Sequence, residues 1–425
     1  MKGMHRLFVL LMVIVSVVFS AELCSASGFA LYEASARGNA LAGALVARAD
    51  DPSALFFNPA GITQLPGLQM MAGATFIMPT TKVTTYSPQA VTTTSVANTW
   101  IPPHLYATYQ ATDKVWLGLG VFSPFGLGTE FPETWPGRYN SYKAIIQTID
   151  VNPNIAFKVN DKFSFALGLD LIYFDLNLKR KIPSAPFTGG RDVGDIDGSL
   201  QGSTMGVGLN VALHGRPFDW LRLGLSYRSQ TTVSVSGDAT FVRPSAFSSS
   251  PILSTLFNNT TGTGSITLPD ELYLGAAFYP IKDFSVEVGA IWTHWATYNA
   301  LTVTYDTAPY PGGSSSSDVK NWHNVWRPFI GAEYKATDWL DLRAGYAFDQ
   351  EAIDNQYADY LVPANNRHLF SVGPGFHWQK WSLDLSYTYL LITDRDNVPA
   401  HGFVLPSSFT NGHANMVGCS LGYKF

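Results

Sequence analysis

Apolar and polar residues alternate with a period of two over much of the chain. From Phe163 to Leu171 the odd positions are apolar and the even positions are small or charged. The pattern recurs at Leu221–Tyr227, Leu340–Phe348 and Leu383–Tyr389. Such alternation predicts strands with one apolar face and one more polar face. A soluble sandwich would show the same alternation, so the connecting segments must distinguish the two architectures.

The connecting segments are of two kinds. Short polar turns are flanked by aromatic residues, as at Asp113–Trp116, Asp161–Phe163 and Asp338–Trp339. Longer segments rich in Pro, Ser, Gly and Asn lie between them, for example Thr81–Asn98 and Ala239–Gly264. Short turns at one end and long loops at the other are typical of bacterial outer-membrane β-barrels, in which the aromatic residues mark the membrane interface.

The expected fold class is therefore all-β, a transmembrane antiparallel β-barrel of about fourteen strands. Closure of such a sheet pairs every backbone group that faces hydrocarbon. The expected strands are Leu68–Thr80, His104–Ala111, Val115–Phe125, Lys143–Val159, Phe163–Arg180, Gly198–Gly215, Trp220–Gly237, Ser265–Tyr279, Phe284–Tyr305, Lys320–Lys335, Trp339–Phe348, Arg367–Trp378, Trp381–Thr393 and Asn411–Phe425.

The C-terminus fits the same fold. Val417, Cys419, Leu421, Tyr423 and Phe425 share one face of the last expected strand, which predicts that Cys419 faces lipid. The final aromatic residue resembles the signal that the outer-membrane assembly machinery reads. Lipid, lipopolysaccharide and this machinery are therefore expected partners, and the barrel is expected to be a monomer.

Composition agrees with a membrane barrel of an exported protein. The chain is 46% hydrophobic but only 14% charged, against ~25% in typical soluble proteins. Leu7–Phe19 is an apolar run followed by small residues, so residues 1–26 are expected to be a signal peptide. The formal net charge of −5, with no basic tract, argues against nucleic acid as a partner. The expected location is the outer membrane of a Gram-negative bacterium.

Residues 27–66 precede the first expected strand and do not alternate. Within them, Phe56-Phe57 runs into Asn58-Pro59-Ala60, a turn sequence with apolar neighbours. A fourteen-strand lumen is too wide for wall side chains to fill. We therefore expect a partly helical hatch at 27–66 that plugs a barrel formed by 67–425, with the Asn58 turn buried inside it.

The sequence resembles the FadL-type transporters of long-chain fatty acids and aromatic hydrocarbons, and the resemblance covers the whole mature chain. The residues that carry the resemblance, in their order along the chain, are Gly28-Phe29, Asn58-Pro59-Ala60, Phe122–Phe131, Tyr227-Arg228-Ser229, Leu268–Glu271, Trp292, Trp295 and Phe425.

The resemblance implies a function and a mechanism. Extracellular loops would capture a long-chain fatty acid or another hydrophobic compound, which would then bind in a lumenal pocket that includes Phe29. The hatch would block the axial route, and an inward kink in the third strand would open the wall. Pro124-Phe125-Gly126 suits that kink, because Pro124 cannot donate to a β-ladder and Gly126 weakens the strand.

The resemblance also suggests ligand contacts. Arg180 corresponds to an arginine that would pair with a carboxylate, although a solvated cation at the base of a loop is the equal alternative. A second basic residue of the family corresponds to Thr302, which favours a less polar ligand. Separately, Pro251 can begin a helix, and Ile252, Leu253, Leu256 and Phe257 are then expected on one face of it. An exposed apolar helix face marks ligand entry or partner contact.

Other classes of function are less well supported. The inward-facing charges are expected to form ion pairs in the wall; they are Asp170, Arg222, Arg228, Glu287, Asp341, Arg343 and Asp384. The histidines show no metal spacing and no Gly-x-Ser-x-Gly stretch occurs, so we expect no enzyme, metal or cofactor. A surface adhesin or antigen, or an outer-membrane lipid hydrolase, remains the alternative.

Overall fold

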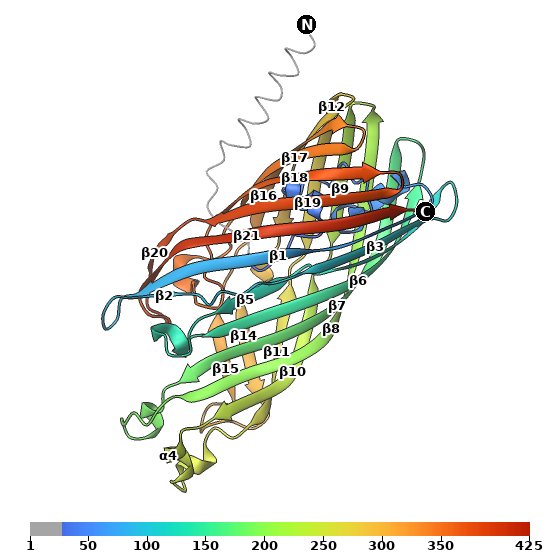
Figure 1. Cartoon of the computed structure of the whole chain (residues 1–425). Coiled ribbons are helices and arrows are strands. Elements are labelled where there is room, and N and C mark those ends of the chain that lie inside the picture. Colours follow the sequence, from blue (N-terminus) through green and yellow to red (C-terminus); the bar gives the residue numbers. More distant parts are fainter. Residues whose placement is uncertain (1–27) are drawn as a thin grey trace.

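The computed structural model describes residues 28–425 and contains a closed antiparallel β-barrel of fourteen wall strands. This confirms the expected fold class and strand number. The proposed signal peptide, residues 1–26, lies outside the described residues. Figure 1 shows the strands wrapped around the segment that precedes β1, drawn in blue inside the barrel.

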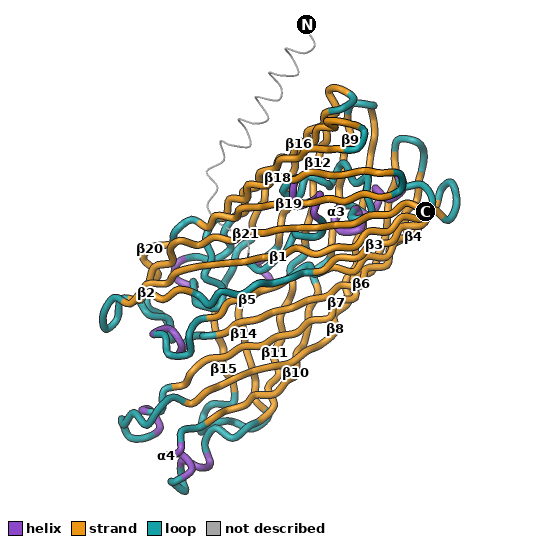
Figure 2. The backbone as a smooth tube through the Cα atoms, viewed as in Figure 1, coloured by secondary structure: helices purple, strands orange, loops and turns teal. Residues whose placement is uncertain are grey.

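Within residues 28–425, twenty-one strand segments build the fourteen wall strands, because several wall strands are interrupted. Figure 2 shows the strands and the loops that connect them. The first ten segments are β1 (Leu68–Thr85), β2 (Val91–Thr94), β3 (Pro103–Gln110), β4 (Val115–Phe122), β5 (Gly126–Glu130), β6 (Lys143–Lys158), β7 (Phe163–Ile182), β8 (Ile196–Phe218), β9 (Leu221–Arg228) and β10 (Thr231–Val242). The others are β11 (Thr260–Leu268), β12 (Glu271–Ile281), β13 (Phe284–Thr293), β14 (Ala300–Tyr305), β15 (Ser315–Val319), β16 (Val325–Thr337), β17 (Leu340–Asp349), β18 (Arg367–Trp378), β19 (Trp381–Ile392), β20 (Arg395–Val398) and β21 (Ser407–Lys424).

The barrel closes between its first and last strands. β1 pairs antiparallel with β21 from Gln69 opposite Lys424 to Thr85 opposite Ser407. Along β7, Leu167 and Leu169 are exposed on the outside, whereas Asp170 and Phe174 are buried on the inside. The sequence alternation therefore separates a lipid-facing side from a lumenal side, and Cys419 is exposed on the outer face as expected.

Several wall strands are interrupted. The third, where a kink was expected, ends at Phe122 and resumes at Gly126, and the eighth, expected to be continuous, breaks at Pro269-Asp270. The ninth breaks after Thr293 for a short 3-10 turn. Proline cannot donate to a ladder, which accounts for the first two breaks. These interruptions shape the lumen and the wall around the candidate site.

Helices are short and few. They are α2 (Ala36–Ala40), α3 (Ala54–Phe57), η1 (Pro59–Gln64), η2 (Pro136–Tyr139), η3 (Ala185–Phe187), α4 (Ser245–Ser248), η4 (Leu253–Thr255), η5 (Trp295–Thr297) and η6 (Asn355–Tyr357). None of the helices in the described part of the chain has the length and apolar character needed to cross a membrane.

Candidate ligand-binding lumen

Residues 28–66, here called the lumenal segment, lie within the barrel (Figure 1) and are held there by polar contacts with the wall and with one another. At its first helix, Ser35 caps α2 by accepting from the Gly38 N–H at 3.0 Å. The Ala36 N–H donates to Ser420 Oγ of β21 at 2.8 Å. Such contacts supply the partners that buried backbone groups need away from water.

Asn58 shows how a turn can be buried. Its side chain is fully buried, and Nδ2 donates to the carbonyl oxygens of Val46 at 2.8 Å and Leu213 at 3.0 Å. Its Oδ1 accepts from the Ala60 N–H at 3.2 Å, where Pro59 begins η1. One amide side chain therefore ties the turn to itself and to β8.

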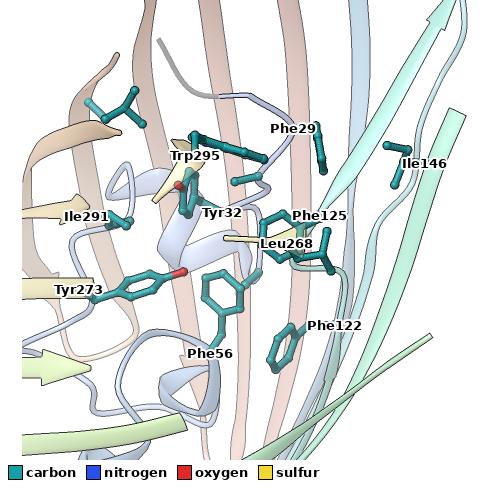
Figure 3. Close-up of a cluster of buried hydrophobic side chains, with 14 of the residues drawn as sticks. Phe29, Tyr32, Phe56, Phe122, Phe125, Ile146, Leu268, Tyr273, Ile291 and Trp295 are labelled. Carbon is teal, nitrogen blue, oxygen red and sulfur yellow. The ribbon is translucent and has the colours of Figure 1, made fainter. Parts of the chain in front are cut away.

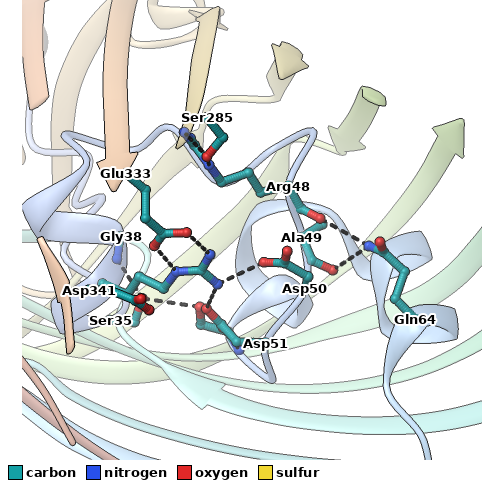
Figure 4. A network of polar contacts seen from close by, with 12 residues as sticks. Ser35, Gly38, Arg48, Ala49, Asp50, Asp51, Gln64, Ser285, Glu333 and Asp341 are labelled. Atoms are coloured by element: carbon teal, nitrogen blue, oxygen red, sulfur yellow. Dashed lines mark hydrogen bonds and ion pairs between the residues drawn. The ribbon is translucent and has the colours of Figure 1, made fainter. Parts of the chain in front are cut away.

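Two arginines of the same segment contact the wall: Arg48 donates to Ser285 at 3.2 Å (Figure 4), and Arg37 pairs with Glu333. Arg37 forms ion pairs with Asp50 at 2.7 Å, Asp51 at 2.9 Å and Glu333 at 2.8 Å. Burial raises the pKa of Asp50, but Arg37 and Arg222 outweigh this effect and lower it below its usual value. The two arginines therefore favour the charged form of the Asp50 carboxylate.

Glu287 of β13 is the second anchor. Its carboxylate accepts from the backbone N–H groups of Val46, Ala47 and Arg48 at 2.7, 2.9 and 2.9 Å. The Arg48 guanidinium lies 3.5 Å away, and neither side chain is exposed. A buried charge with this many partners fixes the position of the segment in the lumen.

The seven inward-facing charges expected to pair within the wall form two groups in the structure. Arg228 pairs with Asp170, and Arg343 pairs with Asp384 at 2.5 Å and Asp341 at 3.3 Å, as wall pairs. Arg222 and Glu287 instead pair with Asp50 and Arg48 of the lumenal segment. Sequence reasoning missed this second role because it treated the wall alone.

Wall strand 3 is interrupted at Pro124-Phe125, within the stretch that the sequence marked as a kink. β4 pairs with both β3 and β6, whereas β5 pairs only with β6 within residues 28–425. The Phe125 N–H donates to Thr148 Oγ1 at 3.0 Å, and that hydroxyl donates to the Phe125 carbonyl at 2.6 Å. Thr148 therefore satisfies backbone groups that the missing ladder would have paired.

The lumenal segment occupies the free edge at this break. The Leu31 N–H donates to the Pro124 carbonyl at 2.8 Å, and the Gly126 N–H donates to the Phe29 carbonyl at 2.9 Å. Ala30 thus bridges to Phe125 as a short antiparallel pair. Residues 29–31 therefore form two backbone hydrogen bonds with wall strand 3 at the break, where the neighbouring wall strand does not pair with it.

A cavity of about 400 Å³ lies at the same break. On the inside it is lined by Phe29, Leu369 and Met416, and near the outer surface by Ile101 and Tyr173. Ile101 is 52% exposed and Tyr173 is 42% exposed, so the cavity reaches the lipid-facing side. Its volume and mainly apolar lining are typical of small-molecule pockets.

Aromatic side chains surround Phe29 (Figure 3). Its ring lies 4.7 Å from Trp295, 5.9 Å from Trp322 and 6.2 Å from Phe125, measured between centroids. All these contacts are edge-on, the arrangement that aromatic quadrupoles favour. A Cβ on Gly28 would lie 2.1 Å from a Trp322 ring atom, so any other residue at position 28 would clash with this ring unless the ring moved.

The cations of the lumen differ from those expected. Arg180 faces inward, but it lies over the Phe403 ring at 5.7 Å and does not line the cavity. Thr302 faces outward and bonds Ser317 at 2.7 Å, so it does not replace a lumenal lysine. The expectation of a less polar ligand, which rested on Thr302, therefore loses its basis.

Besides Arg37 and Arg48, the lumenal cations Lys320, Arg327 and Arg367 were also missed in the sequence. Lys320 is buried between Asp318, at 2.6 Å, and Asp359. Burial lowers the pKa of Lys320, but these carboxylates outweigh it and raise the pKa above its usual value. Arg327 and Arg367 line the cavity. The alternation could have revealed Arg327, which shares the inner face of β16 with Val325 and Phe329.

The loop residues expected to receive ligand do not form a single helical face. Only Leu253–Thr255 is helical, Ile252 is 77% exposed, and Phe257 is fully buried with a φ of 54°. Phe257 packs with Phe247 and Ile196, and Leu253 and Leu256 pack against that cluster. The prediction was wrong because the apolar side chains build a small core between the extracellular loops.

Comparison with known proteins agrees with this architecture. Residues 17–425 match the model of the family described as outer membrane protein transport protein (OMPP1/FadL/TodX). A putative outer membrane protein of Neisseria meningitidis is 27% identical, with 96% of each chain covered. A long-chain fatty acid transport protein of Escherichia coli O6:H1 is 24% identical, with 97% of each chain covered.

Solved structures show the same fold. A Pseudomonas aeruginosa FadL homologue superposes with a TM-score of 0.81 at 20% identity, covering 94% of this chain and all of that one. The Pseudomonas putida toluene transporter TodX gives 0.71 at 17% identity, covering 93% and 99%. Members of this family are transport channels rather than enzymes, which rules out the lipid hydrolase alternative. The chain belongs to the OMPP1/FadL/TodX family of outer membrane transport proteins.

Proposed function

We propose that this protein takes up hydrophobic compounds across the outer membrane and releases them sideways through its wall. The observation that carries the proposal is the cavity that extends from inward-facing Leu369 to outward-facing Tyr173 at the break in wall strand 3. Relatives named for long-chain fatty acid transport and for toluene transport support the same class of substrate.

The lumenal segment, residues 28–66, acts in this proposal as the hatch. Its anchors at Arg37, Arg48 and Asn58 hold it across the lumen, which supports a blocked axial route. Phe29 lines the cavity at the point where residues 29–31 bond to the break. A compound leaving the lumen would pass beside residues 29–31 and would not need to displace the part of the segment anchored at Arg37, Arg48 and Asn58.

Sideways release suits an apolar cargo. A hydrocarbon that leaves through the wall enters the bilayer and never crosses water, so its transfer carries no hydration penalty. The free edge of β5 would normally be costly in hydrocarbon. Thr148 and residues 29–31 satisfy part of that edge, which supports a break that persists in the folded barrel.

Uptake by cells tests the proposal directly. Cells that lack their own FadL-type proteins would be compared with and without this protein, using radiolabelled oleate and toluene, with labelled sucrose as a hydrophilic control. We expect the protein to accelerate uptake of the hydrophobic compounds and leave sucrose unchanged. Equal acceleration of all three would indicate a general pore, and no acceleration would favour the adhesin or antigen alternative.

A further inference from the structure

Wall strands 2 and 3 separate from each other beside the cavity. Wall strand 2 consists of β2 and β3, and residues 95–102 connect these two segments. At one end of the gap, β3 pairs with β4 as far as Leu105 opposite Val121. At the other end, the Val96 N–H donates to the Glu130 carbonyl of β5 at 2.8 Å. Between these two points no ladder joins the two wall strands within residues 28–425.

The indole of Trp100 lies in this gap. Trp100 belongs to the connection in wall strand 2, and its ring packs against Gly128 of β5 in wall strand 3. A Cβ on Gly128 would be only 2.0 Å from the ring atom Cε2, so the ring occupies the space that a side chain at position 128 would take. Trp100 and Gly128 both line the cavity. The ring therefore reaches from one wall strand to the other across the opening.

The backbone of Trp100 is fixed, whereas its ring is held by packing. The Trp100 N–H donates to the Ile77 carbonyl at 2.9 Å, and the Ile77 N–H donates to the Trp100 carbonyl at 2.8 Å. The indole Nε1 is buried without a hydrogen-bond partner among the described residues, although buried tryptophan N–H groups usually have one. Rotation of the side chain would therefore break no hydrogen bond of the ring and would leave the backbone of wall strand 2 in place.

The cavity reaches the outer side of the wall while the ring is in this position. Ile101, which follows Trp100, and Tyr173 of β7 line the cavity and are both exposed. A narrow compound therefore has a path beside the ring, whereas a wide compound has to displace it. The ring limits the cross-section of what can pass and does not seal the opening.

We propose that Trp100 is a size filter for hydrophobic cargo that leaves through the break in wall strand 3. With the indole packed on Gly128, narrow cargo such as a monocyclic aromatic passes beside it. Wide cargo such as a fused polycyclic aromatic passes only after the side chain rotates away. This inference rests on the proposed function and assigns the residue that selects cargo at the same opening.

The test compares two neutral aromatic compounds that differ in width. Radiolabelled toluene and pyrene would be supplied to cells that lack their own FadL-type proteins and produce this protein or a variant. The variants are Trp100→Ala, Trp100→Leu and, as the control for loss of an exposed indole, Trp326→Ala, since Trp326 is 38% exposed and does not line the cavity. Unheated gel mobility would show whether each barrel is folded, and each rate would be divided by the amount of folded protein.

We expect Trp100→Ala to raise the initial uptake rate of pyrene about tenfold, the effect of no longer having to displace a partly buried aromatic ring, and to change that of toluene less than about twofold. Trp100→Leu should raise the pyrene rate by a smaller factor, and Trp326→Ala should change neither rate. An unchanged or lower ratio of pyrene to toluene uptake in both Trp100 variants, or an equal rise of this ratio in Trp326→Ala, would overturn the filter.

Uptake of oleate separates failure of the filter from failure of the proposed function. If the wild type accelerates none of toluene, pyrene and oleate, the proposed function is wrong and the filter with it. If the wild type accelerates oleate alone, or if it accelerates toluene and the pyrene-to-toluene ratio does not respond to residue 100, only the filter is wrong.

Discussion

Removing the Glu287 carboxylate should release the middle of the lumenal segment while the barrel stays intact. In Glu287→Ala, three buried backbone N–H groups and the Arg48 guanidinium lose their shared acceptor. Breaking a buried ion pair by removing one partner costs about 3–5 kcal/mol, because an uncompensated charge remains. At about 1.4 kcal/mol per factor of ten, local opening should become roughly a hundred- to several thousandfold more frequent.

Hydrogen exchange read by mass spectrometry measures this opening. Peptides covering residues 44–64 should exchange faster in Glu287→Ala by that factor, whereas peptides from β7 and β8 should be unchanged and serve as internal standards. Ser285→Ala is the matched control, since Ser285 contacts the same arginine only at 3.2 and 3.4 Å. Its effect should stay below about tenfold. Unchanged exchange in Glu287→Ala, or equal effects in the two variants, would refute the reasoning.

Three further outcomes follow from the same contacts. Asn58→Ala leaves the Val46 and Leu213 carbonyls without this donor, so proteolysis between residues 46 and 60 should become faster by about one to two orders of magnitude while the barrel assembles normally. Replacing both Pro124 and Gly126 with Val should allow strand pairing to resume, and uptake should fall while ligand binding persists; unchanged uptake would count against sideways release. Phe257→Ala should lower the free energy of unfolding of the loop cluster by about 3–5 kcal/mol. The loops should then be cleaved faster by protease, while the purified barrel binds ligand as tightly as before.

The barrel could be predicted from sequence because a lipid-facing wall constrains every second residue. Leu167 and Leu169 face outward and Asp170 faces inward, so local alternation specifies the strand and its orientation. Asn58-Pro59-Ala60 was expected inside the barrel because its neighbours are apolar and do not alternate with polar residues, so this stretch does not fit a wall strand. These inferences depend on residues close together in the chain.

The candidate site depends on residues far apart in the chain, which local patterns do not reveal. The break in wall strand 3 is stabilised by the Thr148 hydroxyl and by the backbone of residues 29–31, and neither contact leaves a local signature. The loop helix at Ile252 was predicted from Pro251 and the apolar spacing that follows it, but packing of these side chains against other loops determined the conformation. Thr302 was placed by correspondence with the family, and a shift of one residue in a strand reverses the face.

The contacts of the lumenal segment also determine when it can fold. The Ala36 N–H bonds to Ser420, 384 positions later, and Arg37 bonds to Glu333, 296 positions later. Contacts between such distant residues form late, because the intervening chain must be ordered first. Ala36 and Arg37 can therefore dock only after β21 and β16 have formed, so we expect the sheet to close before this segment docks. An assembly intermediate that lacks the last strand should therefore hold residues 28–66 undocked, so docking of this segment would report that the wall is complete.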